Sequence, residues 1–178
     1  DVPNGEPKEI PFKFPELLPT EMRMKITKTG FCASDAFQYN GSWKTDDQMV
    51  FPLVPGHEVA GHVTCMGDEV KGFEVGQRVS FGVFSSKCGS CSHCNVGRND
   101  NCMSFGEIYP PGFGGWATHT QQNYEFFTAI PEGILDEHVA PLMCAGMTMY
   151  KPLRNHGFPG ARIAVNGIGG LGHMGIQY

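Results

Sequence analysis

The sequence has 178 residues, enough for one ordinary domain and the start of a second. Hydrophobic residues make up 40% of the chain and charged residues 17%, which is typical of a globular protein and excludes an intrinsically disordered one. The net charge of −5 provides no basic surface for nucleic acid, and no apolar run of about eighteen residues would span a membrane. We therefore expect a cytoplasmic protein that binds neither nucleic acid nor membranes.

The first part of the chain predicts short strands separated by glycine turns. MRMKITK (22–28) alternates apolar and polar residues, as a half-buried strand does. HEVAGHVTCMG (57–67) and QRVSFGV (77–83) are two more strand-like runs, and 117–131 predicts extended segments. We expect a mixed fold that begins with a compact β-rich domain, a distorted barrel.

Helical spacing begins near Leu135. We expect Pro141 to open a second short helix at its first position, and Pro152 to end or kink it. ARIAV (161–165) then predicts a strand, followed by a glycine turn and the start of a helix. We place the domain boundary near residue 146, with a β-rich domain over 1–146 and the beginning of an α/β domain over 147–178. Because the sequence lacks an initiator Met and stops within the last predicted helix, we expect a part of a longer protein.

Four cysteines lie close together, with the spacing C-x2-C-x2-C-x7-C. Four thiolates around one tetrahedral zinc leave no open coordination position, so such a site is structural. A disulfide framework is the alternative, but an odd total of seven cysteines without a secretion signal argues against it. An iron–sulfur cluster is disfavoured too, since the ferredoxin run ends with a three-residue gap and a proline. The four candidate zinc ligands are Cys88, Cys91, Cys94 and Cys102.

A second set of candidate metal ligands is dispersed along the chain. Cys32 follows a predicted strand, His57 and Glu58 begin another, and Cys144 lies where the chain turns helical. Each alone has a structural explanation, since a buried cysteine behaves as a small hydrophobic residue. Together, two cysteines and a histidine make a catalytic zinc site with an open fourth position. Spacing alone does not establish that these residues meet.

The glycine loop near the end of the sequence matches the pattern G-x-G-x-x-G at Gly167, Gly169 and Gly172. The pattern is weak alone, but here it follows an apolar run and opens a predicted helix, as a dinucleotide-binding loop requires. Gly167 would make the tight turn, Gly169 would admit a pyrophosphate and Gly172 would allow close packing. The alternative is a strand–turn–helix unit without a ligand. The residue that separates NAD from NADP would follow about twenty positions on, beyond this sequence.

In combination, these motifs resemble the N-terminal half of a zinc-dependent medium-chain alcohol dehydrogenase of the cinnamyl alcohol dehydrogenase type. The resemblance extends from about Met22 to the end of the sequence. It implies a GroES-like catalytic domain followed by the truncated start of a Rossmann domain. The matching motifs, in order, are GFCASD, PLVPGHEVAGHV, GDEVKGFEVGQRV, CGSCSHCNVGRNDNC, FGGWATH, APLMCAGMTMYKPL and VNGIGGLGHMGIQ.

The resemblance implies roles for individual residues. Cys32, His57 and Cys144 would bind the catalytic zinc, with Glu58 beside it as an alternative ligand. Ser34 would be the proton-relay hydroxyl, and Asp35 would accept a hydrogen bond from the far nitrogen of His57. Trp43 would line the substrate pocket, although ordinary packing explains it equally well. Ala33 departs from the family pattern, in which a histidine often extends the proton path.

The resemblance also implies a nicotinamide cofactor, with NADP favoured over NAD, and two zinc ions per chain. The expected reaction interconverts a primary alcohol, whether allylic, aromatic or aliphatic, and its aldehyde, in a homodimer when the protein is full length. The alternative is a non-catalytic dehydrogenase-fold protein that retains its zinc sites. We expect the 178-residue chain alone to bind nucleotide poorly and to be inactive. The expected cofactor-binding residues are Thr148, Gly167, Gly169, Gly170, Leu171 and Gly172.

Overall fold

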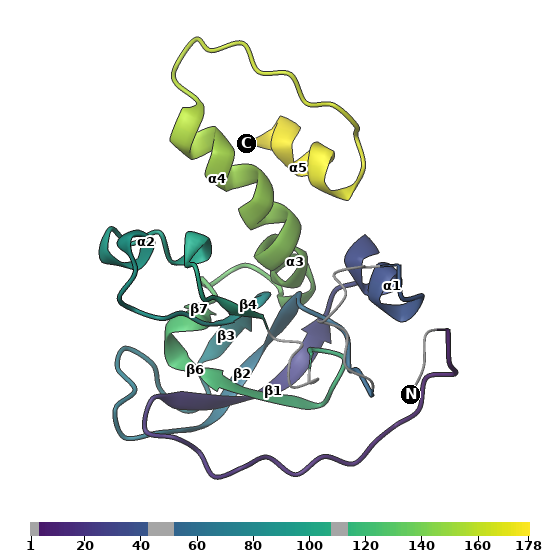
Figure 1. Cartoon of the computed structure of the whole chain (residues 1–178), viewed down its shortest axis with the longest axis vertical. Helices are drawn as coiled ribbons and strands as arrows, with labels where there is room; N and C mark the ends of the chain where they lie inside the picture. The colour runs from purple at the N-terminus through teal and green to yellow at the C-terminus, as the bar shows by residue number, and fades with distance from the viewer. Residues whose placement is uncertain (1–3, 43–51, 108–113) are drawn as a thin grey trace.

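The structure, a computed structural model, describes residues 4–42, 52–107 and 114–178. A curled antiparallel sheet lies at one end, and the helices of the C-terminal segment extend away from it (Figure 1). The strands are β1 (Glu21–Thr29), β2 (Val59–Met66), β3 (Arg78–Phe81), β4 (Phe84–Ser86), β5 (Gly106–Glu107), β6 (His119–Asn123) and β7 (Phe127–Ala129). The longer helices are α1 (Ala33–Tyr39), α3 (Asp136–Pro141), α4 (Met147–His156) and α5 (Gly170–Gln177). The shorter ones are α2 (Ser92–Asn95), the 3-10 helices η1 (Asn99–Asn101) and η2 (Tyr124–Phe126), and the π-helix η3 (Leu142–Gly146).

The main sheet is strongly curled, as its strand order requires. Its five strands are ordered β6-β1-β2-β3-β7, so β6 and β7 form opposite edges. In a flat sheet these edges would lie roughly 19 Å apart. However, only η2 separates Asn123 from Phe127 along the chain, and that length of backbone reaches roughly 15 Å when fully extended. The sheet therefore bends its two edges towards each other, in agreement with the expected distorted barrel.

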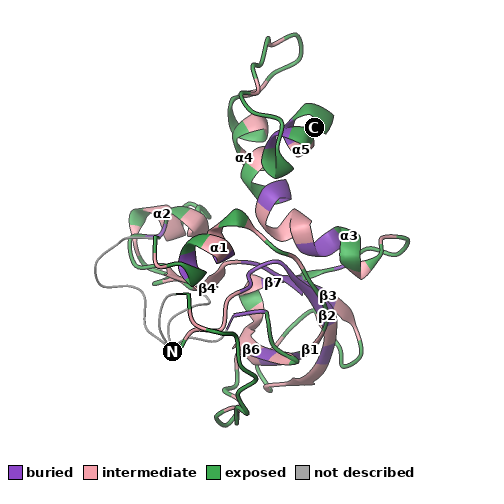
Figure 2. Cartoon of the chain, turned by 90° about the vertical axis from the view of Figure 1, so that its right-hand side faces the viewer, coloured by how far each residue is buried: buried purple, intermediate pink, exposed green. Residues whose placement is uncertain are grey.

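The core forms inside this curl, where alternate residues of the strands point. Met22 and Met24 on β1 are fully buried, whereas the intervening Arg23 is only half-buried. Figure 2 shows the buried residues gathered along β1, β2 and β3. The strands predicted at 22–28, 57–67 and 77–83 are thereby confirmed as β1, β2 and β3. The core cluster consists of Met22, Met24, Val59, Val63, Val79, Phe81 and Phe127.

The helical segment differs from its prediction at Pro141, and Pro152 does not end the helix that contains it. Pro141 does not open a helix but is the last residue of α3, after which the chain continues through η3. Pro152 lies inside α4, which continues to His156. A proline in a helix removes one backbone donor, here the bond to the carbonyl of Thr148, and the rest of α4 forms despite that loss. Among the described helices, none is both long and apolar enough to cross a bilayer.

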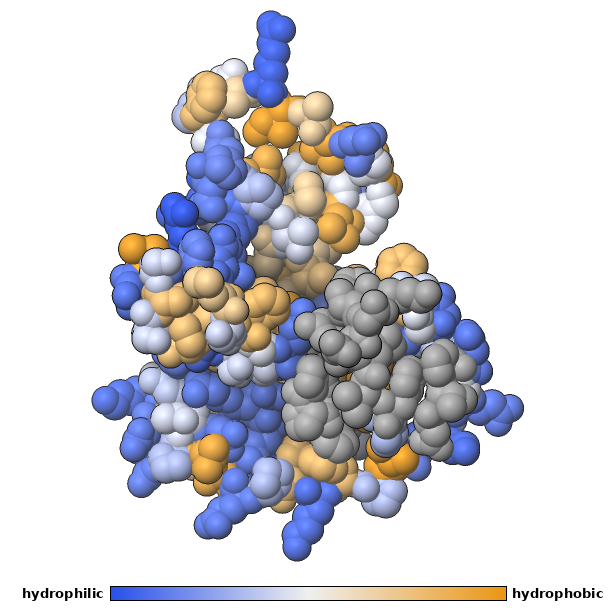
Figure 3. Space-filling view, in the orientation of Figure 1, coloured by the Kyte–Doolittle hydropathy of each residue, from blue (hydrophilic) through white to orange (hydrophobic). Residues whose placement is uncertain are grey.

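The strand predicted at 161–165 is wrong. Residues 161–169 form no regular secondary structure, and the chain between α4 and α5 is largely exposed (Figure 2). A strand needs a neighbour to complete its backbone hydrogen bonds, and no described strand pairs with this segment. Its apolar side chains therefore remain open to solvent, and hydrophobic residues gather over this end of the molecule in Figure 3. Ile163 and Ile176 are both more than half exposed, at 54% and 60%.

Helix α3 is attached to the outer face of the sheet by an ionic contact and a small apolar cluster. Arg78 on β3 donates from Nε and Nη2 to Asp136 Oδ1, at 2.9 and 2.6 Å, and Thr27 on β1 donates to Asp136 Oδ2. Partial burial alone would raise the pKa of Asp136, but the hydrogen bonds from Thr27 and Arg78 outweigh it and lower the pKa. Beneath these groups, Val139 and Ala140 pack with Ala60 and Ile130.

We predict that Asp136→Asn lowers the free energy of unfolding at pH 7 by about 1–2 kcal/mol, the lower part of the range for charged hydrogen bonds because Arg78 is partly exposed. The folded pKa of Asp136 lies below its unfolded value, so its contribution is present above about pH 4 and is lost as the pH falls through the folded pKa. The difference between the parent and Asp136→Asn should therefore shrink at about pH 3. Urea unfolding at both pH values, with a chelator throughout, measures it.

Glu137→Gln is the matched control for this prediction. Glu137 is the next residue of α3, and its contact with Lys28, at 3.9 Å, joins two side chains that are about half exposed. Exposed ion pairs contribute roughly 0–1 kcal/mol, so this variant should resemble the parent at both pH values. An equal loss of stability in the two variants would contradict a specific role for Asp136.

Candidate metal centres

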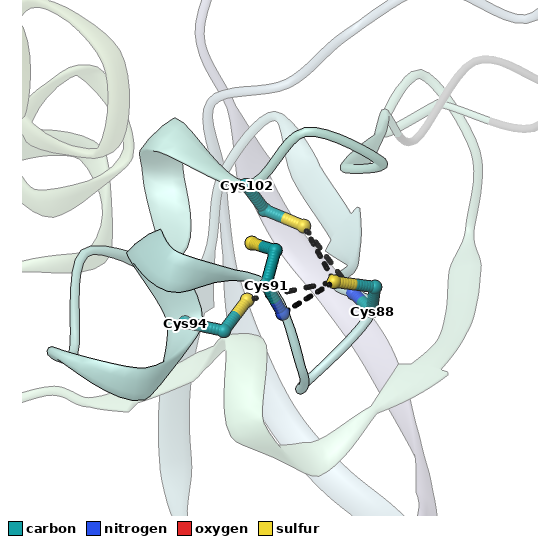
Figure 4. Close-up of side chains that lie close together, drawn as sticks. All are labelled: Cys88, Cys91, Cys94 and Cys102. Carbon is teal, nitrogen blue, oxygen red and sulfur yellow. Dashed lines mark hydrogen bonds between the residues drawn. The ribbon is translucent and has the colours of Figure 1, made fainter.

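The four clustered cysteines form a compact group of sulfur atoms in the loop between β4 and β5 (Figure 4). Cys88 Sγ lies 3.5 Å from Cys102 Sγ and 3.9 Å from Cys94 Sγ. A tetrahedral zinc with Zn–S bonds of about 2.3 Å requires sulfurs roughly 3.8 Å apart. All four sulfurs lie within 4.8 Å of one another, and all seven cysteines of the chain are free thiols. The group therefore fits zinc and is not a pair of disulfides.

Backbone donors around these sulfurs favour the thiolate form that a metal needs. The N–H of Cys91 points at Cys88 Sγ, and the N–H groups of Cys88 and Ser104 point at Cys102 Sγ, at distances of 3.3–3.4 Å. Hydrogen bonds from the backbone of Ser90 and Cys91 lower the pKa of Cys88 to about 6. Helices α2 and η1 in this loop contain no buried residue. A bound zinc would therefore stabilise a segment that has little apolar packing.

The dispersed residues are brought together from three separate elements. Cys32 follows β1 and is the N-cap of α1. His57 and Glu58 directly precede β2. Cys144 lies in the middle of η3, between α3 and α4. Short π-helical segments are frequent at functional sites because they change which way a side chain points.

These residues converge on one place. His57 Nε2 lies 3.3 Å from Cys144 Sγ, and Cys144 Sγ lies 3.9 Å from Cys32 Sγ. One ligand atom from each of Cys32, His57, Glu58 and Cys144 lies within 4.8 Å of the others. Ser34 Oγ is 3.4 Å from His57 Nε2, on the same side of the ring as the sulfurs. Two thiolate sulfurs, one imidazole nitrogen and one carboxylate oxygen form a donor set suited to zinc.

Asp35 supports this group from behind the imidazole. Its carboxylate has no exposed surface, and Oδ1 lies 3.3 Å from His57 Nδ1. A proton held on Nδ1 by Asp35 would make Nε2 the nitrogen that binds a metal. The same carboxylate accepts the backbone N–H groups of Cys32 and Gly56, each at 2.9 Å. One side chain therefore holds the backbone at Cys32 and beside His57, and it also orients the imidazole of His57.

Without a metal ion, the side chains of this group retain protons that balance their charges. Burial alone would lower the pKa of His57, but the hydrogen bonds to Asp35 and Cys144 raise it to about 11. Burial raises the pKa of Glu58, and the charge of Asp35 adds to the effect. The hydrogen bond with His57 lowers the pKa of Cys144, but burial and the charges of Cys32 and Glu58 outweigh it and raise the pKa. Crowded anionic donors of this kind are neutralised when they bind a metal.

Of the remaining predicted site residues, the structure describes Thr148 and the glycine loop but not Trp43. Thr148 is exposed on α4, one turn after Cys144. Gly167 has a φ of +88°, and a side chain on Gly172 would collide with the Gly167 carbonyl, so both glycines are required where they stand. Gly169 precedes α5, and Gly170 and Leu171 begin it. Trp43 lies outside the described residues.

The structure also identifies a residue that sequence reasoning missed. Glu107 on β5 is half-buried, and burial raises the pKa of its carboxyl while the charge of His57 lowers it. Burial is the larger of the two effects, so the pKa of Glu107 is raised overall. No motif includes Glu107, and the β4–β5 pairing that carries it is only a few residues long.

Comparison with known proteins agrees with this geometry. Residues 18–132 match the family described as the alcohol dehydrogenase GroES-like domain. Cinnamyl alcohol dehydrogenase 8 of Arabidopsis thaliana is 36% identical over 89% of this chain and 46% of its own length. A probable cinnamyl alcohol dehydrogenase 1 of Eucalyptus gunnii is 38% identical over 89% of this chain and 47% of its own.

Solved structures show the same architecture. A cinnamyl alcohol dehydrogenase of Sorghum bicolor superposes with a TM-score of 0.84 and 30% identity, over 93% of this chain and 49% of the other. The Helicobacter pylori enzyme complexed with NADP(H) gives a TM-score of 0.82 and 30% identity, over 90% of this chain and 48% of the other. The fold and its two groups of candidate zinc ligands are those of the GroES-like domain of medium-chain, zinc-type alcohol dehydrogenases. The chain belongs to the alcohol dehydrogenase GroES-like family. Within that family it is similar to cinnamyl alcohol dehydrogenases. It spans about half the length of the curated relatives it matches.

We predict that the purified chain binds two zinc ions and that Cys102→Ser and Cys144→Ser each remove one, from different groups. Zinc is counted by mass spectrometry of the metal after dialysis against a weak chelator. Cys65→Ser is the control, because Cys65 lies on β2 outside both groups and its loss should leave both ions bound. A parent that holds no zinc, or a Cys65→Ser variant that loses one ion, would contradict the assignment.

Proposed function

We propose that the protein is a zinc-dependent oxidoreductase that interconverts a primary alcohol and its aldehyde with a nicotinamide cofactor. The observation that carries the proposal is the meeting of Cys32, His57 and Cys144 at one point, with Glu58 beside them. A set of two cysteines and one histidine is the catalytic arrangement of alcohol dehydrogenases and leaves one coordination position for a substrate. The similarity to cinnamyl alcohol dehydrogenases supports an allylic or aromatic substrate in particular.

Zinc in this group would be held by the two thiolates and His57 Nε2, and would supply a Lewis acid that polarises the substrate oxygen. The residues around it would then position the substrate and move its proton. Ser34 Oγ, 3.4 Å from His57 Nε2, lies close enough to the ligands to exchange a proton with an oxygen bound there. Glu58 is 4% exposed, and its raised pKa favours the neutral carboxyl as long as no cation neutralises the site.

The proton path must continue from Ser34 without a second imidazole. Ala33 begins α1 and has no polar side-chain atom. Asp35 is occupied by His57 and by two backbone donors, so it serves to orient and not to transfer protons. In this proposal the proton leaves Ser34 through water.

The cofactor would be bound by the glycine loop and the start of α5. The N–H groups at a helix N-terminus favour a phosphate, and Gly167 provides the tight turn that brings them near. We assign residues 1–146 to the catalytic domain and 147–178 to the beginning of the cofactor domain. The Helicobacter pylori relative was solved with NADP(H), which supports NADP. A cytoplasmic homodimer is part of the same proposal.

The test uses a fusion protein in which this chain is followed by the remaining half of the Sorghum bicolor relative, so that a complete cofactor domain is present. We expect Cys32→Ala and Cys144→Ala to reduce cinnamaldehyde turnover to background because each removes a zinc ligand. Ser34→Ala should retain zinc but react about a hundredfold more slowly, as expected for a lost proton-transfer group. Steady-state rates with NADPH and NADH, together with zinc content, measure both effects. Full turnover in a variant that lacks zinc would refute the zinc-dependent mechanism, whereas a zinc-loaded parent without turnover would support the non-catalytic alternative.

The 178-residue chain without that addition should bind NADPH weakly and show no turnover, because a dinucleotide-binding sheet needs two βαβαβ halves. Calorimetric titration with NADPH tests this expectation. Tight binding by the chain alone would contradict it.

A further inference from the structure

The motif FGGWATH includes Trp116, a residue that the proposed reaction does not use. Trp116 contacts two segments that each carry a candidate zinc ligand. Its indole Nε1 donates to the carbonyl of Gly30 at 3.3 Å, and its ring stacks on Phe31 with centroids 5.7 Å apart and planes inclined by 23°. These contacts hold the segment that ends in Cys32.

The backbone of the same motif holds the segment that ends in His57. Trp116 N donates to the carbonyl of Pro55 at 2.9 Å, and Gly115 N donates to the carbonyl of Gly56 at 2.7 Å. Gly30 N in turn donates to the carbonyl of Glu58 at 2.7 Å. Gly30 is therefore fixed from both sides, by Glu58 at its N–H and by Trp116 at its carbonyl.

The packing around Gly56 shows how closely Trp116 is fitted. Gly56 has a φ of +98°, and a methyl group there would collide with the indole ring and with the backbone nitrogen of Trp116. The N–H of Gly56 is one of the two backbone donors that hold Asp35. The ring thus lies directly against Gly56, which donates its N–H to Asp35 and directly precedes His57.

Burial in a core does not explain this arrangement. Phe31 is 68% exposed and Trp116 is 40% exposed, so the stacked pair lies at the surface. The buried part of the indole contributes to folding, but the ring does not belong to the clusters of buried core residues. Its distinguishing contacts are those with Gly30, Phe31 and Gly56, each within two residues of a candidate ligand.

We propose that Trp116 is a positioning residue of the dispersed zinc site: it ties Gly30–Cys32 to Pro55–His57 and so sets the spacing between Cys32 Sγ and His57 Nε2. The inference rests on the metal site of the proposed function. Residues that hold metal ligands in place typically affect metal affinity by 10–100-fold when they are replaced. Among the described residues, the hydrogen bonds and ring stacking of Trp116 reach Gly30, Phe31 and Pro55 and none reaches the four-cysteine loop, so that loop provides an internal reference.

The experiment measures metal affinity at the two sites separately in the 178-residue chain. Cobalt(II) replaces zinc, because a site with four thiolates and a site with two give thiolate-to-cobalt absorption of different intensity. Chelator competition then yields an affinity for each site. We expect Trp116→Ala to weaken the dispersed site by about tenfold or more and the four-cysteine site by less than about twofold. Trp116→Phe, which keeps the stacking but loses the indole N–H, should fall between the parent and Trp116→Ala.

Phe12→Ala is the matched control, because Phe12 is another surface aromatic, 43% exposed, that packs on a second ring, that of Phe14. It should leave both affinities at the parent values. An equal loss of cobalt affinity at both sites in Trp116→Ala, or no loss at either site, would overturn the proposal. If Trp116→Ala does not fold, Trp116→Phe decides: parent affinity at the dispersed site in that variant would also overturn the proposal. A parent chain that binds no cobalt at the dispersed site would instead refute the proposed function.

Discussion

The candidate active site depends on one buried carboxylate. Asp35 accepts two backbone N–H groups and faces an imidazole nitrogen, and these three donors belong to Cys32, Gly56 and His57. An unpaired charge with no exposure would be costly, so the fold must provide these donors, and by providing them it places the candidate ligands. The requirement for compensated charge therefore determines the arrangement of the site.

The two metal groups are supported in different ways. The dispersed group is built on a sheet, a short helix and a π-helix, and His57 and Glu58 are buried. The four-cysteine group lies in a loop whose helices have no buried residue, and in the described part of the chain backbone N–H groups and the other thiols approach its sulfurs. The first group can therefore be preformed by the packing of the domain, whereas the second depends on its ion for its shape.

Most of the fold followed from local patterns, and the exceptions have physical reasons. The alternation of Met22, Arg23 and Met24 predicted β1 because one face of that strand is buried. ARIAV is a short apolar run that also predicted a strand, but it forms none, because strand formation depends on a partner that a local pattern does not reveal. Pro152 is tolerated inside α4, where one lost hydrogen bond is outweighed by those of the remaining turns. The clustered cysteines were predictable from spacing, whereas the convergence of Cys32, His57 and Cys144 required resemblance. The burial of Glu107 and the contacts of Trp116 could be seen only in the three-dimensional structure.

The open strip of apolar side chains between α4 and α5 has a practical consequence. Leu153, Ile163, Val165 and Ile176 line a hollow with no described strand beside it. Exposed apolar surfaces of this kind tend to associate with one another, so we expect solutions of the chain to self-associate as the concentration rises. Low protein concentration, or fusion to a highly charged carrier protein, should reduce self-association through these apolar side chains.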